Sequence, residues 1–142
     1  MDDAVNLYYK YISNWGGAVT TYKFQAIKEN KVVKEVVRKP VSKVDLDINV
    51  SHTELIEDTT YDVASIQIRA VDDNGSVLPY YQEALEISME GPISLIGPRV
   101  VPLRGGMSGT YVKTLGIEGA AKLIIKCHNI EKTVDFNIRK EK

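Results

Sequence analysis

The chain has 142 residues, of which 44% are hydrophobic and 26% are charged. This length allows one domain or one domain plus a further segment, and the ordinary composition excludes wholesale disorder. The formal net charge is −1, so the chain lacks the positive field with which proteins bind nucleic acids or anionic membranes. No stretch approaches 18 apolar residues, which excludes a membrane-spanning helix. We expect no signal peptide in the acidic start MDDAVNLYYK.

The first 42 residues are expected to form a β segment distinct from the rest of the chain. VNLYYKYIS, TTYKFQAI and VVKEVVRK indicate three strands, because each is rich in aromatic and β-branched residues, and KENK indicates the turn between the last two. Three strands without a partner sheet seldom stand alone. We therefore expect 1–42 either to pack onto the rest of the chain or to be a β segment from the preceding region of a longer parent protein, with a boundary near Lys39–Lys43.

Residues 43–142 show a hydrophobic period of two, with no helical stripe. The alternation is clearest in VDLDINV and VASIQIRAV, and it recurs in EALEISME, AKLIIKC and TVDFNI. Turn signals such as DDNG, EGP, IGPR and GIEG separate these runs. About 100 residues with about seven short strands are typical of one immunoglobulin-like domain. The sequence therefore predicts an all-β fold, an immunoglobulin-like β-sandwich over 43–142 with an additional N-terminal β segment.

The glycine-rich stretch LRGGMSGTYVKT raises the question of a phosphate-binding loop. A Walker-type loop needs G-x-x-x-x-G-K-[ST] before a helix, and neither Gly105 nor Gly106 has a second glycine at the required spacing. The following residues favour a strand. We therefore interpret RGGMSG as the connection between a strand that ends near Leu103 and one that begins near Thr110.

Other candidates for metal or catalytic chemistry are weak. AVDDNGS fails the calcium-loop spacing, because Tyr81 stands where the bidentate glutamate belongs, and a turn is favoured. His52 and His128 are the only histidines, and their spacing matches no zinc site. Cys127 is the only cysteine, so no internal disulfide can form, and its apolar surroundings indicate a buried structural thiol. We assign no catalytic, metal or cofactor residue and expect no cofactor.

Carboxylates and aromatics leave one functional alternative open. Asp45 and Asp47 alternate with apolar residues and are expected to share the solvated face of one strand, so they do not make the facing pair of a glycosidase. Trp15, Tyr80 and Tyr81 are candidate carbohydrate contacts, because exposed aromatic rings stack on sugars. The alternative is that these three residues fill domain contacts.

The runs IRAVDDNGSVLPYY, GPISLIGP and LRGGMSGTYVKT carry a family resemblance. They resemble the C-terminal immunoglobulin-like domains of glycoside hydrolase family 2 enzymes, the β-galactosidase-like group, and NWGGAVTTYKFQAIKENKVVKE resembles the segment before that domain. The resemblance implies a non-catalytic accessory β-sandwich of a bacterial sugar-cleaving enzyme. In that family two glutamates of a separate barrel perform the chemistry, and nothing in this chain corresponds to that barrel.

These observations lead to one functional hypothesis and two alternatives. In the first, the chain is inert by itself and has a structural role towards the catalytic barrel or in subunit association, so its partners are the other domains of the parent enzyme. The alternatives are a carbohydrate-binding module and a bacterial surface immunoglobulin-like module. Because the 1–42 segment would leave apolar surface or strand edges open, we also expect the isolated fragment to form homodimers. No nucleic acid or membrane partner is expected.

Overall fold

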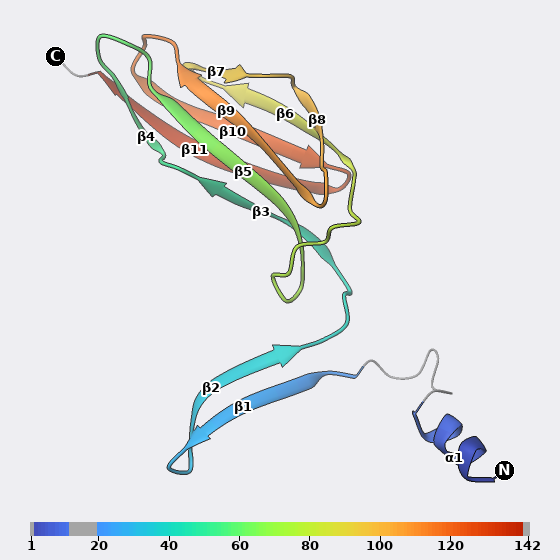
Figure 1. Ribbon diagram of the computed structural model, residues 1–142. Coiled ribbons are helices and arrows are strands. Elements are labelled where there is room, and N and C mark those ends of the chain that lie inside the picture. The colour runs from blue at the N-terminus through green and yellow to red at the C-terminus, as the bar shows by residue number, and fades with distance from the viewer. Residues whose placement is uncertain (1, 12–19, 141–142) are drawn as a thin grey trace. The chain divides into compact units, whose positions relative to one another are not determined.

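The chain divides into two compact units, Met1–Pro40 and Val41–Lys142. The computed structural model, drawn in Figure 1, describes residues 2–11 and 20–140 of them. Each unit is described by itself below. No helix among the described residues is long and apolar enough to cross a membrane.

The first element of the chain corrects the sequence prediction. Asp2–Tyr11 forms helix α1, so the strand predicted in VNLYYKYIS is wrong. Val5, Tyr8 and Tyr9 recur at helical spacing, which places them on one side of a helix. The acidic residues at the start stabilise the helix, because they lie at the positive end of its dipole. Lys10 in the last turn stabilises the negative end in the same way. These local effects prevail over the β propensity of valine and tyrosine.

The two other strands predicted in this segment are confirmed. β1 (Tyr22–Lys28) and β2 (Lys31–Arg38) pair antiparallel in a two-stranded sheet. Glu29 and Asn30 connect them with φ angles of 50° and 58°. Two central residues with positive φ define a type I′ turn, whose twist matches that of the strands that it joins. Every residue of both strands is exposed.

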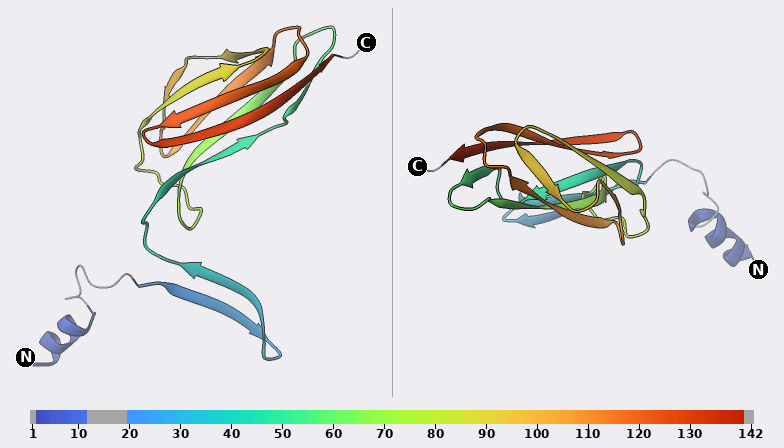
Figure 2. Two further views of the ribbon diagram at one scale, coloured as in Figure 1. Left: turned by 180° about the vertical axis from the view of Figure 1, so that it is seen from behind. Right: turned by 90° about the horizontal axis from the view of Figure 1, so that it is seen from above.

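The second unit is a β-sandwich of two sheets packed face to face, as the view from above in Figure 2 shows. One sheet has the order β3-β5-β9-β7, and the other has the order β4-β11-β10-β6-β8. The strands are β3 Val44–Val50, β4 Glu54–Glu57, β5 Val63–Asp72, β6 Ala84–Glu90, β7 Ile93–Ile96, β8 Val100–Pro102, β9 Met107–Thr114, β10 Gly119–Cys127 and β11 Ile130–Lys140.

This topology matches the predicted immunoglobulin-like fold. The orders β3-β5-β9-β7 and β6-β10-β11 reproduce the ABED and CFG sheets of immunoglobulin domains. β4 and β8 add short strands at two edges, which is why the structure has more strands than the seven expected. β4 has 4 residues and β8 has 3. Strands of this length carry too few residues for a pattern of alternation to reveal them.

The predicted alternation places the core where the sequence indicated. In β5, Ala64, Ile66, Ile68 and Ala70 are each at most 1% exposed. Leu123 and Ile125 of β10 face them from the other sheet and are fully buried. Burial of a leucine or isoleucine side chain stabilises the fold by about 1.5–3 kcal/mol. Cys127 is also buried, as predicted.

Candidate functional site

A groove of about 630 Å³ runs along one side of the β-sandwich. Its lining comes from the start of β3, from the loop before β6 and from the β10–β11 turn. The lining residues are Ser42, Lys43, Val44, Asp45, Tyr81, His128, Asn129, Ile130, Glu131 and Lys132. We call this depression the side groove.

Tyr81 is held in the side groove by its backbone and by its hydroxyl. Its N–H donates to the carbonyl of Leu78 in the LPYY turn, at 3.0 Å. Its hydroxyl lies 3.7 Å from Sγ of Cys127. Burial, together with the neighbouring Cys127 thiol, raises the pKa of the Tyr81 hydroxyl to about 12. The phenol therefore stays neutral across the physiological pH range.

The three aromatic residues that the sequence singled out have different surroundings. Tyr81 lines the side groove and packs against the core. Tyr80 is 94% exposed and is not among the lining residues. Trp15 lies outside the described residues. A sugar or domain contact through these residues stays a prediction.

The side groove contains an ion pair that links the two sheets. Lys132 Nζ, from β11, lies 2.8 Å and 2.9 Å from the two carboxylate oxygens of Asp45, on β3. The hydrogen bond from Lys132 lowers the pKa of the Asp45 carboxyl. The expectation that Asp45 and Asp47 lie on the outer face of one strand holds, but both carboxylates are paired, because Asp47 accepts from the guanidinium of Arg69 at 3.0 Å.

A histidine–carboxylate contact lies at the rim of the side groove. His128 is the first residue of the two-residue turn that joins β10 to β11, and its φ angle is 51°. Its Nε2 lies 3.0 Å from Oε2 of Glu83. Few residues other than glycine adopt this backbone conformation. Nothing in the spacing of Glu83 and His128 in the sequence indicates that they meet.

The carboxylates in and beside the side groove are already paired. A glycosidase needs one carboxyl that is kept protonated and another that is free to act as base or nucleophile. Here Asp45 is held by Lys132, and Glu83 is held by His128. Among the described residues no cluster of three or more His, Cys, Asp or Glu side chains could hold a metal ion.

A Ser-His-Asp string connects the loops that flank β4. Ser51 Oγ lies 3.0 Å from Nδ1 of His52, and Nε2 of His52 lies 3.2 Å from Oδ2 of Asp62. The string resembles a hydrolytic triad in composition. However, Ser51 Oγ also accepts the amide of Ser65, and Asp62 accepts the amides of Ile56 and Val63.

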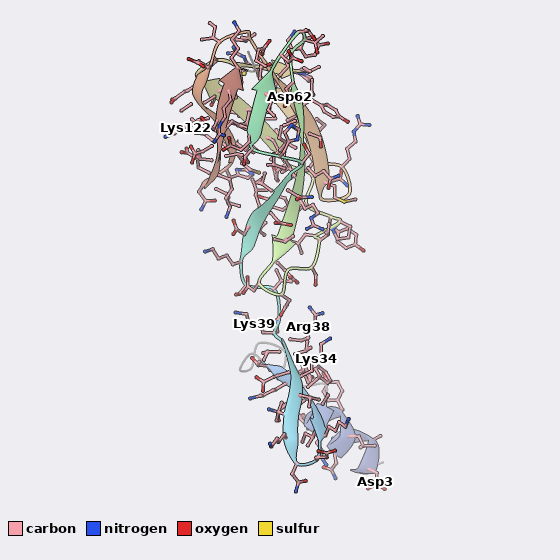
Figure 3. The ribbon with its side chains drawn as sticks, turned by 90° about the vertical axis from the view of Figure 1, so that its left-hand side faces the viewer. Asp3, Lys34, Arg38, Lys39, Asp62 and Lys122 are labelled. Carbon is pink, nitrogen blue, oxygen red and sulfur yellow. The ribbon has the colours of Figure 1, made fainter. Side chains whose placement is uncertain are left out.

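These hydrogen bonds make the string a structural clip. It ties the start and the end of the β4 region to β5, and Figure 3 labels Asp62 at this position. Burial raises the pKa of Asp62, but the amides of Ile56 and Val63 outweigh it, so the pKa is lowered overall. The sequence alone does not indicate this cluster, because Asp62 is ten residues from His52 and only the path of the chain brings them together.

The glycine-rich stretch forms a tight turn, as predicted, but a shorter one. β8 ends at Pro102 and β9 begins at Met107, rather than near Thr110. Gly105 and Gly106 have φ angles of 60° and 73° and form the two central residues of the turn. A Cβ on Gly106 would lie 2.2 Å from the carbonyl oxygen of Leu78. The glycines therefore allow a close backbone approach.

The first unit exposes a large apolar surface, which we call the apolar hairpin. Its side chains are between 37% and 65% exposed, and Tyr22 and Phe24 stack on each other with ring centroids 6.5 Å apart. The residues are Tyr22, Phe24, Ile27, Val32, Val33, Val36 and Val37. Isolated two-stranded sheets are at best marginally stable in water.

The outer face of the sheet that contains β10 is charged rather than apolar, because Lys122 (Figure 3) and Lys126 lie on it.

The sequence has relatives among β-galactosidases, although no family model matches it. It is 30% identical over 78 residues to a β-galactosidase from Rhizobium radiobacter, a match that covers 54% of this chain and 56% of that protein. It is 31% identical over 78 residues to a β-galactosidase from Thermoanaerobacter pseudethanolicus, covering 55% of this chain and 10% of that protein. The chain thus spans about half of the first relative and a small part of the second.

Solved structures share the fold over most of the chain. A glycoside hydrolase family 2 member from Bacteroides cellulosilyticus aligns with a TM-score of 0.65 and 17% identity, over 87% of this chain and 18% of that protein. A β-glycosidase from Bacteroides vulgatus aligns with a TM-score of 0.63 and 16% identity, over 84% of this chain and 17% of that protein. A domain of intimin aligns more weakly, with a TM-score of 0.53 and 15% identity, over 86% of this chain and 64% of that chain.

The fold first defines a class, an all-β protein built on an immunoglobulin-like sandwich. The comparisons then confirm the resemblance seen in the sequence. The chain shares its fold with a domain of glycoside hydrolase family 2 enzymes, and its relatives in sequence are β-galactosidases.

Proposed function

We propose that this chain is a non-catalytic accessory β-sandwich of a glycoside hydrolase family 2, β-galactosidase-like enzyme. Its role is structural, towards the catalytic barrel or in subunit association. The observation that carries the proposal is that the similarity to β-galactosidases falls on a β-sandwich whose groove carboxylates, Asp45 and Glu131, are already paired with lysines. Residues 1–42 then belong to the adjoining region of the parent enzyme.

The apolar hairpin supports the structural role. Exposed apolar patches of this kind mark interaction sites, because soluble proteins rarely leave large ones uncovered. The hairpin exposes both of its faces, so each face is available to a partner surface. In the parent enzyme the partner is the neighbouring domain or another subunit.

Hydrolysis of a chromogenic β-galactoside tests the proposal. The isolated chain is expected to show no activity above buffer, whereas a protein that also includes the coding sequence upstream of Met1 is expected to hydrolyse the substrate. Hydrolysis by the isolated chain would contradict the non-catalytic role. The absence of a catalytic domain from the parent reading frame would contradict the link to an enzyme.

Carbohydrate binding is the second candidate, favoured by the side groove with Tyr81 and by the exposed Tyr80 beside it in the sequence. Calorimetric titration with galactosides and galactans, on the chain and on Tyr80→Ala, tests it. Saturable heat that the substitution weakens supports sugar binding. Equal or absent heat from both proteins rejects the role of Tyr80.

A surface module is the third candidate, favoured by the fold shared with a domain of intimin. It requires tandem copies of the 43–142 unit in the parent protein. A single copy beside a catalytic domain would exclude it. The same upstream sequence therefore separates this candidate from the accessory domain.

A further inference from the structure

β3 is an edge strand: among the described residues it pairs with β5 on one side, and no strand pairs with its other side, which we call the outer edge. The amide of Ser51, which continues β3, donates to the carbonyl of Ser65 at 3.0 Å. Because an antiparallel strand alternates the direction of its amides, Asp45, Asp47 and Asn49 also turn their amides towards β5. The amides of Val44, Leu46, Ile48 and Val50 therefore point to the outer edge.

The amide of Leu46, in the first half of that edge, is already occupied. It donates to Oδ1 of Asp45 at 2.8 Å. The same carboxylate is held by Lys132 from the other sheet. A strand that approached β3 would have to break this hydrogen bond and displace the ion pair before it could pair with Leu46.

β11 presents a second open edge beside the same groove. β4 pairs only with its last residues, Asn137–Lys140. Asn137 donates its amide to Thr53 on the β4 side, so by alternation the amides of Glu131, Thr133 and Asp135 also point outward.

Lys132 lies on this open half of β11, and it lies on the strand's inner face. Phe136 and Ile138 are buried, so the side chains of even-numbered residues face the interior of the sandwich. Lys132 therefore starts from the inner face and reaches out to Asp45. An inward-pointing charge on an edge strand is one of the devices that prevent strands from adding to a sheet.

We propose that the outer edge of β3, which begins beside the side groove, is a latent strand-pairing surface for a second copy of this chain, and that Asp45 and Lys132 keep it closed. The outer edge of β3 is long enough for pairing, since the strand has 7 residues. Two copies that pair β3 with β3 around a two-fold axis would form one continuous antiparallel sheet. This inference concerns self-association of the chain, so it does not depend on the proposed enzymatic parent.

The charges of β3 oppose that pairing in the wild-type chain. When Leu46 lies opposite Leu46, Asp45 of each copy lies opposite Asp47 of the other. Like charges directly opposite each other destabilise a strand pair. The charge repulsion, the occupied amide of Leu46 and the Lys132 bridge all act against pairing, and Asp45 contributes to each of them.

We call the Asp45–Lys132 ion pair, together with the hydrogen bond from the Leu46 amide to Asp45, the guard. Two double variants that conserve the net charge separate its effect from a general loss of surface charge. Asp45→Ala with Lys132→Met removes the guard. Asp47→Ala with Arg69→Met is the matched control, because it removes the other ion pair of β3 and also halves the opposing charges, while the amide of Leu46 stays bound to Asp45. Both variants keep the net charge, and their folding is checked by urea denaturation.

Sedimentation velocity measures the dimer constant of the wild type and of both full-length variants. The guard variant is expected to dimerise about tenfold more tightly than the control, because two-fold symmetry counts each released amide twice. Hydrogen exchange at high concentration is expected to slow at residues 44–50. Equal association of the two variants, or new protection only outside β3, would overturn the proposal. Any dimerisation through the apolar hairpin is common to all three proteins and cancels in the comparison.

Discussion

The hydroxyl of Tyr81 lies 3.7 Å from the sulfur of Cys127. The contact joins the loop before β6 to the last residue of β10 and places the tyrosine ring in the side groove. Cys127 is 1% exposed, so the thiol is shielded from solvent by the same packing. One contact thus holds the groove wall and protects the only cysteine of the chain.

This contact predicts a stability that falls at alkaline pH. The pKa of Tyr81 is about 12 in the folded chain, whereas the pKa of an unfolded tyrosine is about 10. Because the folded state favours the neutral phenol, the contribution is complete below the unfolded pKa and is lost as the pH rises from about 10 towards the folded value. Urea midpoints of the wild type should fall over that range, and those of Tyr81→Phe should fall less. Parallel pH curves for the two proteins would contradict the prediction.

Asp62→Ala is expected to lower the free energy of unfolding by about 1–3 kcal/mol, because it leaves two amides without their acceptor. Those amides belong to Ile56 and Val63. Asp58→Ala, an exposed carboxylate in the same connection, is the control and should change stability little. Urea unfolding of both variants measures the difference. Similar losses in the free energy of unfolding would mean that the hydrogen bonds of Asp62 do not stabilise the fold more than an exposed carboxylate does.

The same carboxylate predicts a loss of stability in acid. The pKa of Asp62 is lowered in the folded chain by its amide partners, against the effect of burial. Its contribution is therefore present above the unfolded pKa of about 3.9 and is lost as the pH falls through the folded pKa. Asp62→Ala should show a weaker dependence on pH in this acidic range than the wild type. An unchanged dependence would show that other carboxyls control acid unfolding.

The two glycines of the β8–β9 turn are expected to differ in their tolerance of a side chain. Gly105→Ala places a Cβ in open space and carries only the cost of positive φ, about 1–2 kcal/mol. Gly106→Ala carries the same cost and also forces a Cβ to 2.2 Å from the carbonyl oxygen of Leu78. We expect Gly106→Ala to lower the thermal midpoint clearly more than Gly105→Ala. Equal midpoints would mean that the LPYY turn moves away freely.

The apolar hairpin predicts that the isolated chain self-associates. Phe24 is 60% exposed, and Phe24→Asp places a charge in any interface that covers it. Sedimentation velocity should show less dimer for this variant than for the wild type. Tyr111→Asp is the matched control, since Tyr111 on β9 is 53% exposed. A monomeric wild type at high concentration would contradict the prediction.

Much of the sandwich could be read from the sequence, because its strands bury one face. Burial selects apolar side chains at every second position, and this left a visible alternation in β5, β6 and β10. The turn between β8 and β9 could also be predicted, because its glycines are visible in the sequence. α1 was misread, because a short segment with several tyrosines and a valine satisfies strand propensity as well as helical spacing.

The sequence by itself determined the fold class, the core and the family resemblance, since all three depend on local patterns and on runs of matching residues. Only the tertiary structure decided which charges meet. Asp45 and Lys132 are 87 residues apart, and Asp47 and Arg69 are 22 apart. Each pair forms where the connections between elements bring distant segments together, and no pattern of neighbouring residues records that meeting. The side groove and its guard therefore emerge only when the two sheets are packed.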